Sequence, residues 1–436
     1  MSTRIGIRRE DKSIWERRVP LVPNDARELQ KAHDIEVWVQ PSDVRAFREE
    51  EYKEAGVRVV EDLSPCPVTF AVKEIPPDFF RPDHAYVFFA HVIKGQEYNM
   101  PMLQRLLELG CHLIDYEKVT DERGRRLIFF GRHAGLAGMV DTLWALGQRL
   151  NWEGIDNPFS DLRQAHEYED LAAIQAAVSD IGARIARERL PGAITPFICG
   201  FAGYGNVFRG ANEIIELLPI QEIAPSEVAA VAQQAQPARD RIYKVVFKEE
   251  HTVEPISPDG AFELQDYYEH PEKYRGRFND YLPHLNVLVN CVYWEEKYPR
   301  LVTKSDLKQL YRGEQPRLRV IGDISCDIEG AIEATVKSTE PGDPVFVYDP
   351  FEDRAIEGVL GNGPVIMAVD ILPSEIPRDS SVYFSEVLKA YIPIIAKADY
   401  SVPFEELDLP PEIKRAVIVY QGELTPEYCY LKQHLE

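Results

Sequence analysis

Two residues able to exchange protons near neutral pH follow apolar segments in the first hundred residues. Lys73 ends the run Val68–Lys73, and His91 ends the run Tyr86–His91. Histidine titrates near neutrality, and a lysine desolvated beside other cations has a lowered pKa and can act as a base. Each residue alone is more typical of a surface lysine or a hydrogen-bonded loop histidine. Together, at the ends of neighbouring predicted strands, they form a candidate acid–base pair.

Arginines are concentrated in the same part of the chain, which is otherwise strongly acidic. Ordinary surface pairing with nearby acids accounts for about half of them. If the others converge on one site, they would bind carboxylates through paired hydrogen bonds. The residues concerned are Arg8, Arg9, Arg17, Arg18, Arg125, Arg126 and Arg132.

A glycine turn lies near the middle of the chain. The apolar run 195–202 leads to Gly203 and Gly205, and a helical pattern follows. Such a turn presents backbone N–H groups to a phosphate, as in dinucleotide-binding folds. The third glycine of the usual G-x-G-x-x-G would fall at Phe208, and the next glycine is Gly210. Taken alone, a strand–turn–helix without a ligand explains the turn nearly as well.

The next strand, predicted over 220–223, bears on cofactor preference. An acid after this strand would hold the adenosine ribose of NAD, but residues 224–226 contain none. Ser226, with Arg239 or Arg241 nearby, would accommodate a 2′-phosphate. The sequence therefore favours NADP(H), and NAD(H) is not excluded.

Apolar strands alternate with helical segments through most of the chain, which predicts α/β folding with parallel sheets whose ligands bind beyond the carboxyl ends of the strands. The spacing of the predicted strands and helices differs between the two halves of the chain. We expect an N-terminal domain of residues 1–148 and 372–436, and a nucleotide-binding domain of residues 149–371. Residues 238–285, aromatic and charged, are expected to be an insertion in the second domain.

Composition excludes several classes of partner. The 436 residues carry a formal charge of −23, which argues against nucleic acid or an anionic membrane as a partner. No run spans a bilayer, no signal peptide is evident, and the ten histidines show no metal-ligand spacing. The six cysteines are scattered, as in a reducing compartment. We therefore expect a cytoplasmic protein without a metal.

Ordered motifs along the whole chain carry a family resemblance. The chain resembles the lysine–2-oxoglutarate reductase part of α-aminoadipic semialdehyde synthase and, more broadly, the alanine dehydrogenase and lysine-forming saccharopine dehydrogenase family. The resemblance implies two Rossmann-like domains with the active site in the interdomain cleft. The motifs are Arg8–Asp11, Trp15–Pro23, Val72–Lys73, Phe88–Lys94, Leu113–Lys118, Gly124–Arg125, Phe130–Gly131, Ala134–Gly138, Gly203–Val207, Val292–Glu295 and Gly322–Asp327.

The reaction implied by this resemblance is the NADPH-dependent condensation of L-lysine with 2-oxoglutarate to saccharopine, a step of lysine degradation. Lys73 and His91 would be catalytic, and Arg18, Lys94 and Arg126 would bind carboxylates, with Glu16 orienting or balancing Arg18. The cofactor would be held by Gly203, Gly205, Asn206, Val207, Asn290, Tyr293 and Asp323. The alternatives are an amino-acid or opine dehydrogenase with another amine and a non-catalytic NADP-binding sensor. A homo-oligomer is compatible with each of these functions.

Overall fold

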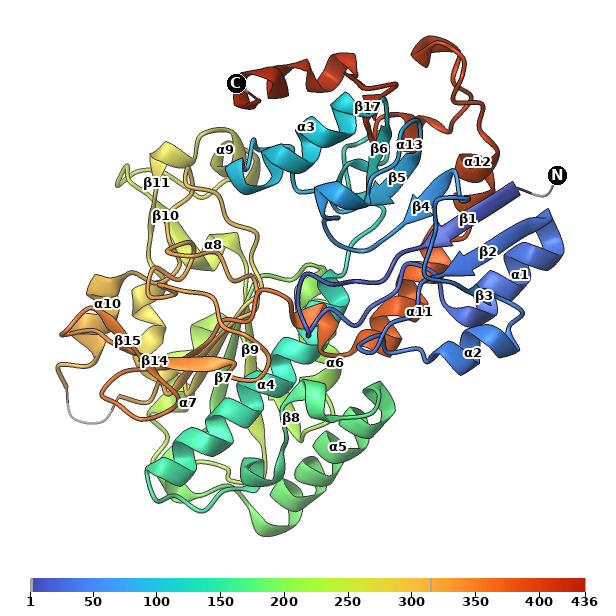
Figure 1. Cartoon of the computed structure of the whole chain (residues 1–436). Helices are drawn as coiled ribbons and strands as arrows, with labels where there is room; N and C mark the ends of the chain where they lie inside the picture. Colours follow the sequence, from blue (N-terminus) through green and yellow to red (C-terminus); the bar gives the residue numbers. More distant parts are fainter. Residues whose placement is uncertain (1–2, 314–315, 436) are drawn as a thin grey trace. The chain divides into compact units, whose positions relative to one another are not determined.

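The computed structural model describes residues 3–313 and 316–435. The chain divides into two compact units (Figure 1). Unit 1 comprises Met1–Phe130 and Pro377–Glu436, and unit 2 comprises Gly131–Ile376. Each unit contains a mainly parallel eight-stranded sheet, which confirms the predicted α/β class with two Rossmann-like domains.

The sheet of unit 1 has the strand order β18-β17-β6-β5-β4-β1-β2-β3. Strands β1 to β6 are parallel, and β17 and β18 are antiparallel. Most of their side chains are buried, as expected for a sheet covered on both faces. The strands are β1 (Thr3–Ile7), β2 (Ile35–Val39), β3 (Arg58–Val59), β4 (Val68–Phe70), β5 (Ala85–Phe88), β6 (His112–Asp115), β17 (Val417–Tyr420) and β18 (Glu423–Leu424).

The helices of unit 1 come from both ends of the chain. They are α1 (Pro23–His33), α2 (Glu49–Glu54), α3 (Met100–Glu108), α11 (Pro377–Leu388), α12 (Ile392–Lys397), α13 (Pro411–Lys414) and the 3₁₀ helix η13 (Pro426–His434). Helix α11 anchors the loop before α1, because the Ser381 hydroxyl accepts from the N–H of Val19 at 2.9 Å and the Ser385 hydroxyl from that of Val22 at 3.0 Å.

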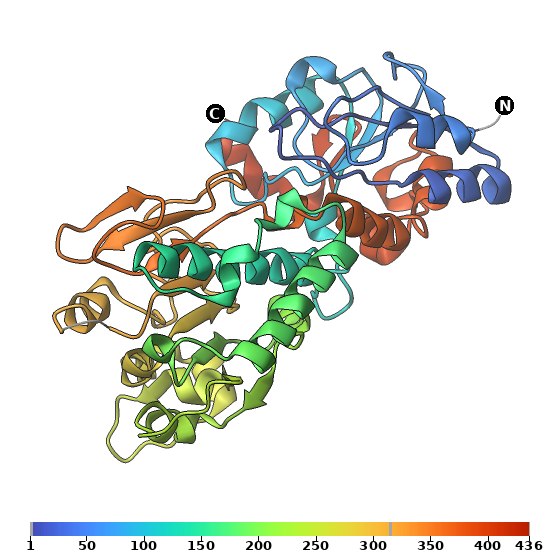
Figure 2. The same ribbon diagram turned by 90° about the horizontal axis from the view of Figure 1, so that it is seen from below.

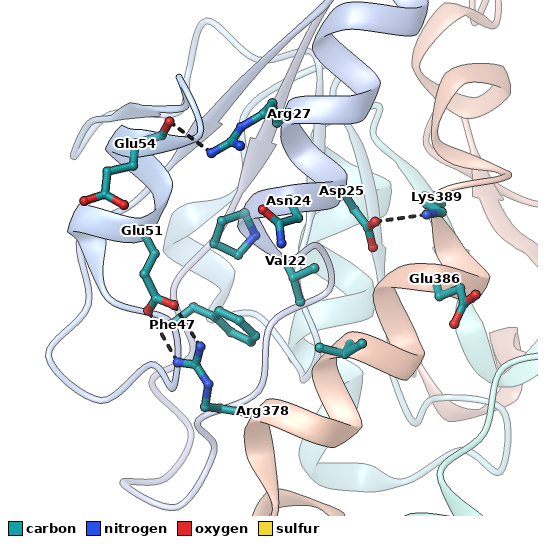
Figure 3. A pocket seen from close by; sticks show the side chains of 12 residues that line it. Val22, Asn24, Asp25, Arg27, Phe47, Glu51, Glu54, Arg378, Glu386 and Lys389 are labelled. Carbon is teal, nitrogen blue, oxygen red and sulfur yellow. Dashed lines mark hydrogen bonds and ion pairs between the residues drawn. The ribbon is translucent and has the colours of Figure 1, made fainter. Parts of the chain in front are cut away.

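A shallow pocket lies between α1, α2 and α11, and its cations are engaged (Figure 3). Arg378 pairs with Glu51 at 2.8 Å, and Lys389 pairs with Asp25 at 3.0 Å. Arg27 donates to the backbone carbonyl of Glu54 at 3.1 Å. These interactions join the returning α11 to the N-terminal helices.

The sheet of unit 2 has the order β15-β14-β16-β13-β12-β7-β9-β8. Strands β14 and β15 are antiparallel to their neighbours, and the others are parallel. The strands are β7 (Ile198–Ala202), β8 (Ile220–Glu222), β9 (Ile242–Phe247), β12 (Val287–Asn290), β13 (Val320–Asp323), β14 (Val345–Asp349), β15 (Arg354–Glu357) and β16 (Val365–Met367).

The structure corrects the predicted insertion, because strand β9 lies inside residues 238–285. Residues 238–285 were expected to lie outside the repeat, yet β9 is inserted between β7 and β8. The charged Lys244 interrupts this apolar run, so the sequence did not indicate a buried strand. In the structure the Lys244 ammonium pairs with Glu222 at 2.9 Å and with Glu216. The irregular region therefore begins only after Phe247, with α8 (Glu249–Thr252), the hairpin β10 (Val253–Pro255) and β11 (Tyr274–Gly276), and α9 (Leu264–Glu269).

The longest helix of unit 2 is α4 (Gly131–Trp152), drawn in teal-green in Figure 2. It packs against α6 (Asn206–Ile215) and against β13, so the division between units falls at Phe130 and not at the expected residue 148. The other helices are α5 (Leu171–Glu188), α7 (Val228–Ala232) and α10 (Lys304–Leu310). No helix in the described ranges is long and apolar enough to cross a membrane.

Two buried carboxyl groups interact in the core of unit 2. Asp141 on α4 and Glu375, after the 3₁₀ helix η11 (Leu372–Ser374), are almost inaccessible to solvent. Burial raises the pKa of Asp141 to about 6, and burial with the negative charge of Asp141 raises the pKa of Glu375 well above its ordinary value. His166 Nδ1 lies 3.9 Å from a Glu375 oxygen, and Glu167 adds negative charge near Asp141.

Glu375→Gln should therefore stabilise the protein increasingly as pH rises. The folded-state pKa values of Asp141 and Glu375 lie above those of the unfolded chain. The two carboxyl groups therefore favour the folded state most below pH ~4, where both are protonated, and this stability is lost as pH rises through their folded-state pKa values. The free energy of unfolding of the variant, minus that of the unmodified chain, should reach on the order of 2 kcal/mol at about pH 8. Urea unfolding at several pH values measures it, with exposed Glu296→Gln as the control. A difference independent of pH would contradict this account.

Candidate active site

Lys73 lies in the loop after β4, three residues beyond the strand end. The buried carboxylate of Glu10 fixes this loop by accepting from the backbone N–H of Val72 at 2.7 Å and from that of Lys73 at 3.0 Å. Burial and the neighbouring charge of Glu16 raise the pKa of Glu10 to about 7. The backbone that carries Lys73 is thus held by an acid that can itself exchange a proton near neutral pH.

The environment of the Lys73 side chain favours loss of its proton. Burial lowers the pKa of Lys73, and the charge of Arg18 lowers it further. The carboxylates of Glu16 and Glu74 act in the opposite direction without reversing the shift. Within the described residues its Nζ atom forms no hydrogen bond, which leaves it available to a bound molecule.

Glu16 and Arg18 form a buried ion pair in the loop before α1. Arg18 Nε donates to Glu16 Oε1 at 2.8 Å, and Arg18 Nη2 donates to Oε2 at 2.6 Å. Burial alone would raise the pKa of Glu16, but the charge and hydrogen bonds of Arg18 and the charge of Lys73 hold it below its ordinary value. The guanidinium also lies 4.5 Å from the ring centroid of Phe130. The predicted pairing of these two residues is therefore present in the structure.

His91 is held in a turn after β5 with a φ angle of +49°, in the left-handed region. The side-chain amide of Asn99 donates to the carbonyls of Ala90 at 3.1 Å and His91 at 3.0 Å, which stabilises the turn. His91 Nδ1 lies 2.7 Å from Glu74 Oε1.

Glu74 orients the imidazole of His91. Burial would raise the pKa of Glu74, but the hydrogen bonds from His91 and Lys12 lower it to about 2, so this carboxylate stays ionised. Lys12 contributes a contact of 2.8 Å. An ionised acceptor at Nδ1 requires a proton there, which leaves Nε2 as the atom that can take up or release a proton.

Lys94 and Arg126 lie apart from this hydrogen-bonded network. Lys94 is exposed, and Arg126, 53% exposed, pairs with Glu117. In the part of the chain that the structure describes, no ion pair joins either of them to Glu16, and neither is linked by one to Glu74. Their assignment as carboxylate-binding residues stays a prediction.

Glu10, Lys12, Glu74 and Asn99 are site residues that the sequence reasoning missed. Glu10 lies inside the motif Arg8–Asp11, and Glu74 follows Lys73 directly. An acid next to a candidate catalytic lysine was the available signal. Which acid bonds the histidine depends on the fold.

The glycine turn of unit 2 has the geometry that a phosphate requires. Gly203 has φ +92°, and a Cβ atom there would lie 3.0 Å from the carbonyl oxygen of Cys291. Gly205 precedes α6, and a Cβ there would meet nothing within 4 Å, so the space before the helix is open. The first N–H groups of α6, from Asn206 and Val207, point toward this end of the helix. These residues fit the pyrophosphate of a dinucleotide.

Phe208 and Gly210 explain the altered glycine spacing. Phe208 packs against Phe201 of β7 with ring centroids 5.6 Å apart, which fixes α6 on the sheet. Gly210 supplies close packing, because a Cβ atom there would lie 1.9 Å from the carbonyl oxygen of Arg132 on α4. The third glycine is thus displaced by two positions to the face that contacts α4.

Gly210→Ala should destabilise unit 2 by about 3 kcal/mol, because the added methyl group overlaps backbone and forces the two helices apart. Thermal or urea unfolding measures the loss. Gly192→Ala is the matched control, since a Cβ at Gly192 meets nothing within 4 Å. Equal stability of the two variants would show that α4 and α6 tolerate separation.

The residues predicted to accommodate a 2′-phosphate lie next to strands β8 and β9. They are Ser226, Arg239 and Arg241. Ser226 is exposed in the 3₁₀ helix η7 (Pro225–Glu227) after the edge strand β8. Arg239 donates to the carbonyl of Leu190 at 2.7 Å, and Arg241 pairs with Asp240 at 2.8 Å. Strand β9 separates Ser226 from β7 in the sheet, and Arg239 and Arg241 precede β9 at the end of the sheet opposite to the glycine turn.

Asn290 and Asp323 meet at the carboxyl ends of the adjacent strands β12 and β13. Asn290 Nδ2 donates to Asp323 Oδ1 at 2.8 Å, and the hydroxyl of Thr335, a residue that the sequence did not single out, donates to Oδ2 at 2.5 Å. Burial raises the pKa of Asp323 to about 6 despite these hydrogen bonds. Tyr293 is 82% exposed, and its hydroxyl bonds Glu295 at 2.9 Å.

Two family models match separate parts of the chain. Residues 6–137 match the alanine dehydrogenase/PNT N-terminal domain, and residues 232–427 match the alanine dehydrogenase/PNT C-terminal domain. A solved L-alanine dehydrogenase has a TM-score of 0.62 at 16% identity, covering 99% of this chain and 100% of its own. A transhydrogenase from Sinorhizobium meliloti has a TM-score of 0.56 at 14% identity, with 97% and 100% covered. At these identities the likeness shows the fold alone.

Curated relatives are similar over nearly the whole chain. Alpha-aminoadipic semialdehyde synthase of Arabidopsis thaliana is 37% identical over 98% of this chain and 41% of its own length. The mitochondrial enzyme of that name from Bos taurus is 34% identical over 98% and 47%. The chain thus spans less than half the length of these relatives. A saccharopine dehydrogenase [NAD(+), L-lysine-forming] of Emericella nidulans is 28% identical over 89% of this chain and 90% of its own.

The two domain matches together cover more than half of the chain. The chain therefore belongs to the alanine dehydrogenase/PNT family of nicotinamide-dependent oxidoreductases.

Proposed function

We propose that this chain catalyses the NADPH-dependent reductive condensation of L-lysine with 2-oxoglutarate to saccharopine. The name of the Emericella nidulans relative supports a reaction of lysine and saccharopine. Because the chain spans less than half of the longer relatives, the proposal covers the reductase step alone. The observation that carries it is the network around Lys73, where a lysine with a lowered pKa lies near a buried arginine and near Glu74, the carboxylate that orients His91.

The condensation needs proton transfer at two stages, and unit 1 provides two groups for it. The lysine amine must attack the ketone carbon as a free base, and the resulting carbinolamine must lose its hydroxyl group as water. The Lys73 ammonium, whose pKa is lowered by burial and by the charge of Arg18, can donate a proton to the departing hydroxyl group. His91, oriented through Nδ1 by Glu74, can accept the amine proton at Nε2.

The substrates carry several carboxylates, so their binding requires cations in a strongly acidic protein. Arg18 uses Nε and Nη2 on Glu16, and its Nη1 forms no hydrogen bond in the described part of the chain. This nitrogen is the group we assign to a substrate carboxylate. Lys94 and Arg126 would bind the others from exposed positions.

The cofactor supplies the hydride that reduces the imine carbon. In unit 2, Gly203 and Gly205 leave room for the pyrophosphate, and the N–H groups of Asn206 and Val207 would donate to it. Asn290 and Asp323 would contact the nicotinamide end, where their mutual hydrogen bond fixes the amide orientation. The expected products are saccharopine, water and the oxidised cofactor.

The free state of all six cysteines accords with a reducing compartment such as the cytoplasm. The bovine relative, in contrast, is named as mitochondrial. We propose the cytoplasm for this chain, and cell fractionation followed by immunodetection would contradict it by recovering the protein with mitochondria.

The reaction is tested by following NADPH absorbance with the purified chain. Oxidation should require both 2-oxoglutarate and lysine, and mass spectrometry should detect saccharopine. Alanine and ornithine replace lysine in parallel reactions to test an amino-acid or opine dehydrogenase. Turnover with one of these amines and none with lysine would overturn the proposal. Cofactor binding without turnover on any amine would instead favour a sensor.

A further inference from the structure

The order of strands in unit 2 changes which residues can reach the ribose of a bound dinucleotide. In a Rossmann fold the strand beside the glycine-turn strand ends near the adenosine ribose, and its terminal residue reads the 2′ position. Here the strand beside β7 is β9, although β8 comes first in the sequence. The ribose-reading position therefore falls after Phe247 and not after β8.

A backbone hydrogen bond connects this strand end to the glycine turn. The N–H of Gly203 donates to the carbonyl of Phe247 at 3.0 Å, so Lys248 directly follows the residue bonded to the turn. Lys248 Nζ lies 5.9 Å from the ring centroid of Tyr204, which stands between the two glycines of the turn. Its side chain is exposed, and in the described residues it has no ion-pair partner.

The neighbouring acid, Glu249, is turned toward two tyrosines. The hydroxyl of Tyr268 donates to its carboxylate at 2.8 Å, and that of Tyr204 donates at 3.2 Å. A carboxylate engaged in this way is less available to a ribose hydroxyl. At the end of β9, then, Lys248 is a cation that pairs with no carboxylate in the described residues. The charged Glu249 is turned to the tyrosines, and Glu250 lies 3.8 Å from His251 Nε2.

We propose that Lys248 is the specificity-determining residue for the cofactor and binds the 2′-phosphate of NADP(H). The proposal deepens the proposed function and rests on it only in assuming a dinucleotide at the glycine turn. It replaces the predicted role of Ser226 with Arg239 or Arg241. Arg239 bonds the Leu190 carbonyl, and Arg241 is paired with Asp240.

Binding of two adenosine fragments tests the proposal without substrates or turnover. Isothermal titration of the full chain with adenosine 2′,5′-bisphosphate and with adenosine 5′-monophosphate isolates the 2′-phosphate. The unmodified chain should bind the bisphosphate at least about 10-fold more tightly. Lys248→Met should weaken bisphosphate binding by about 10- to 100-fold, as loss of a charge-assisted hydrogen bond does, and should change monophosphate binding less than about twofold.

Matched variants separate this role from general charge and from the rival residues. Exposed Lys308→Met removes the same charge elsewhere in unit 2 and should leave both affinities unchanged. Arg241→Met should weaken bisphosphate binding less than Lys248→Met does. NADPH and NADH titrations, followed by cofactor fluorescence, should repeat the pattern.

Three results would overturn the assignment. These are equal affinity of the unmodified chain for both fragments, a larger loss with Arg241→Met than with Lys248→Met, and an equal loss of both fragments in Lys248→Met. Since none of these measurements uses lysine or 2-oxoglutarate, failure of the condensation reaction would leave their outcome intact.

Discussion

Replacing Lys73 by methionine is expected to lower kcat for lysine-dependent NADPH oxidation by about 10²- to 10⁴-fold, the range for loss of a positioned acid–base group. Methionine keeps the length of the side chain and removes the amine. Because Lys73 Nζ has no hydrogen bond in the described residues, its loss should disturb folding little. NADPH affinity should stay within about threefold, since the glycine turn lies in unit 2.

The pH profile gives a second readout of this prediction. If the Lys73 ammonium donates the proton to departing water, kcat/KM falls as pH rises through its pKa, which burial and Arg18 hold below the ordinary lysine value. That alkaline limb should be absent in Lys73→Met. Lys12→Met serves as the control, because Lys12 pairs with Glu74 from an exposed position and its loss should cost at most about 10-fold. Equal losses in both variants would show that Lys73 acts only through charge.

Local patterns were enough to predict the elements that carry the site. The apolar runs before Lys73 and His91 became β4 and β5, and the run before Gly203 became β7. These predictions depend only on alternation of apolar segments with turn residues, which neighbouring chain segments encode. The pairing of Glu16 with Arg18 was instead expected from the family resemblance, and its burial depends on the fold around the loop.

Strand order could not be predicted in the same way. The sequence places β8 directly after β7, but the position of β9 between these two strands depends on burying both of its faces, including Lys244. The ion pair of Lys244 with Glu222 makes that burial possible and joins residues more than twenty positions apart. The consequence for the cofactor site is large, because it shifts the ribose-reading position from Ser226 to Lys248.

The partners of His91 show a similar limit. Nothing in the sequence near His91 indicates that Glu74 bonds its Nδ1 atom, since the two residues belong to loops after different strands. Parallel neighbours β4 and β5 bring these loops to the same edge of the sheet. The contact between His91 and Glu74 therefore follows from the order of the strands, and the sequence predicted only that parallel strands are present.

Arg18→Met should both destabilise unit 1 and weaken binding of 2-oxoglutarate. Removing the guanidinium leaves the carboxylate of Glu16, only 3% exposed, without its bidentate partner, and breaking a buried pair in this way costs about 3–5 kcal/mol. Lys73 remains near this carboxylate and should limit the loss. Urea unfolding measures the stability, and the KM for 2-oxoglutarate should rise by at least about 10-fold at a temperature where the variant is folded.

A double variant separates the two effects. Glu16→Gln with Arg18→Met removes the uncompensated charge, so it should recover at least about half of the lost stability, because most of the cost lies in a buried unpaired ion. Substrate affinity should not recover, since the cation is still missing. Arg378→Met breaks the half-exposed pair with Glu51 in the pocket of Figure 3 and should cost at most about 1 kcal/mol. If the double variant regained 2-oxoglutarate binding along with stability, Arg18 would have a purely structural role, and the carboxylate would have to be bound by Lys94 or Arg126.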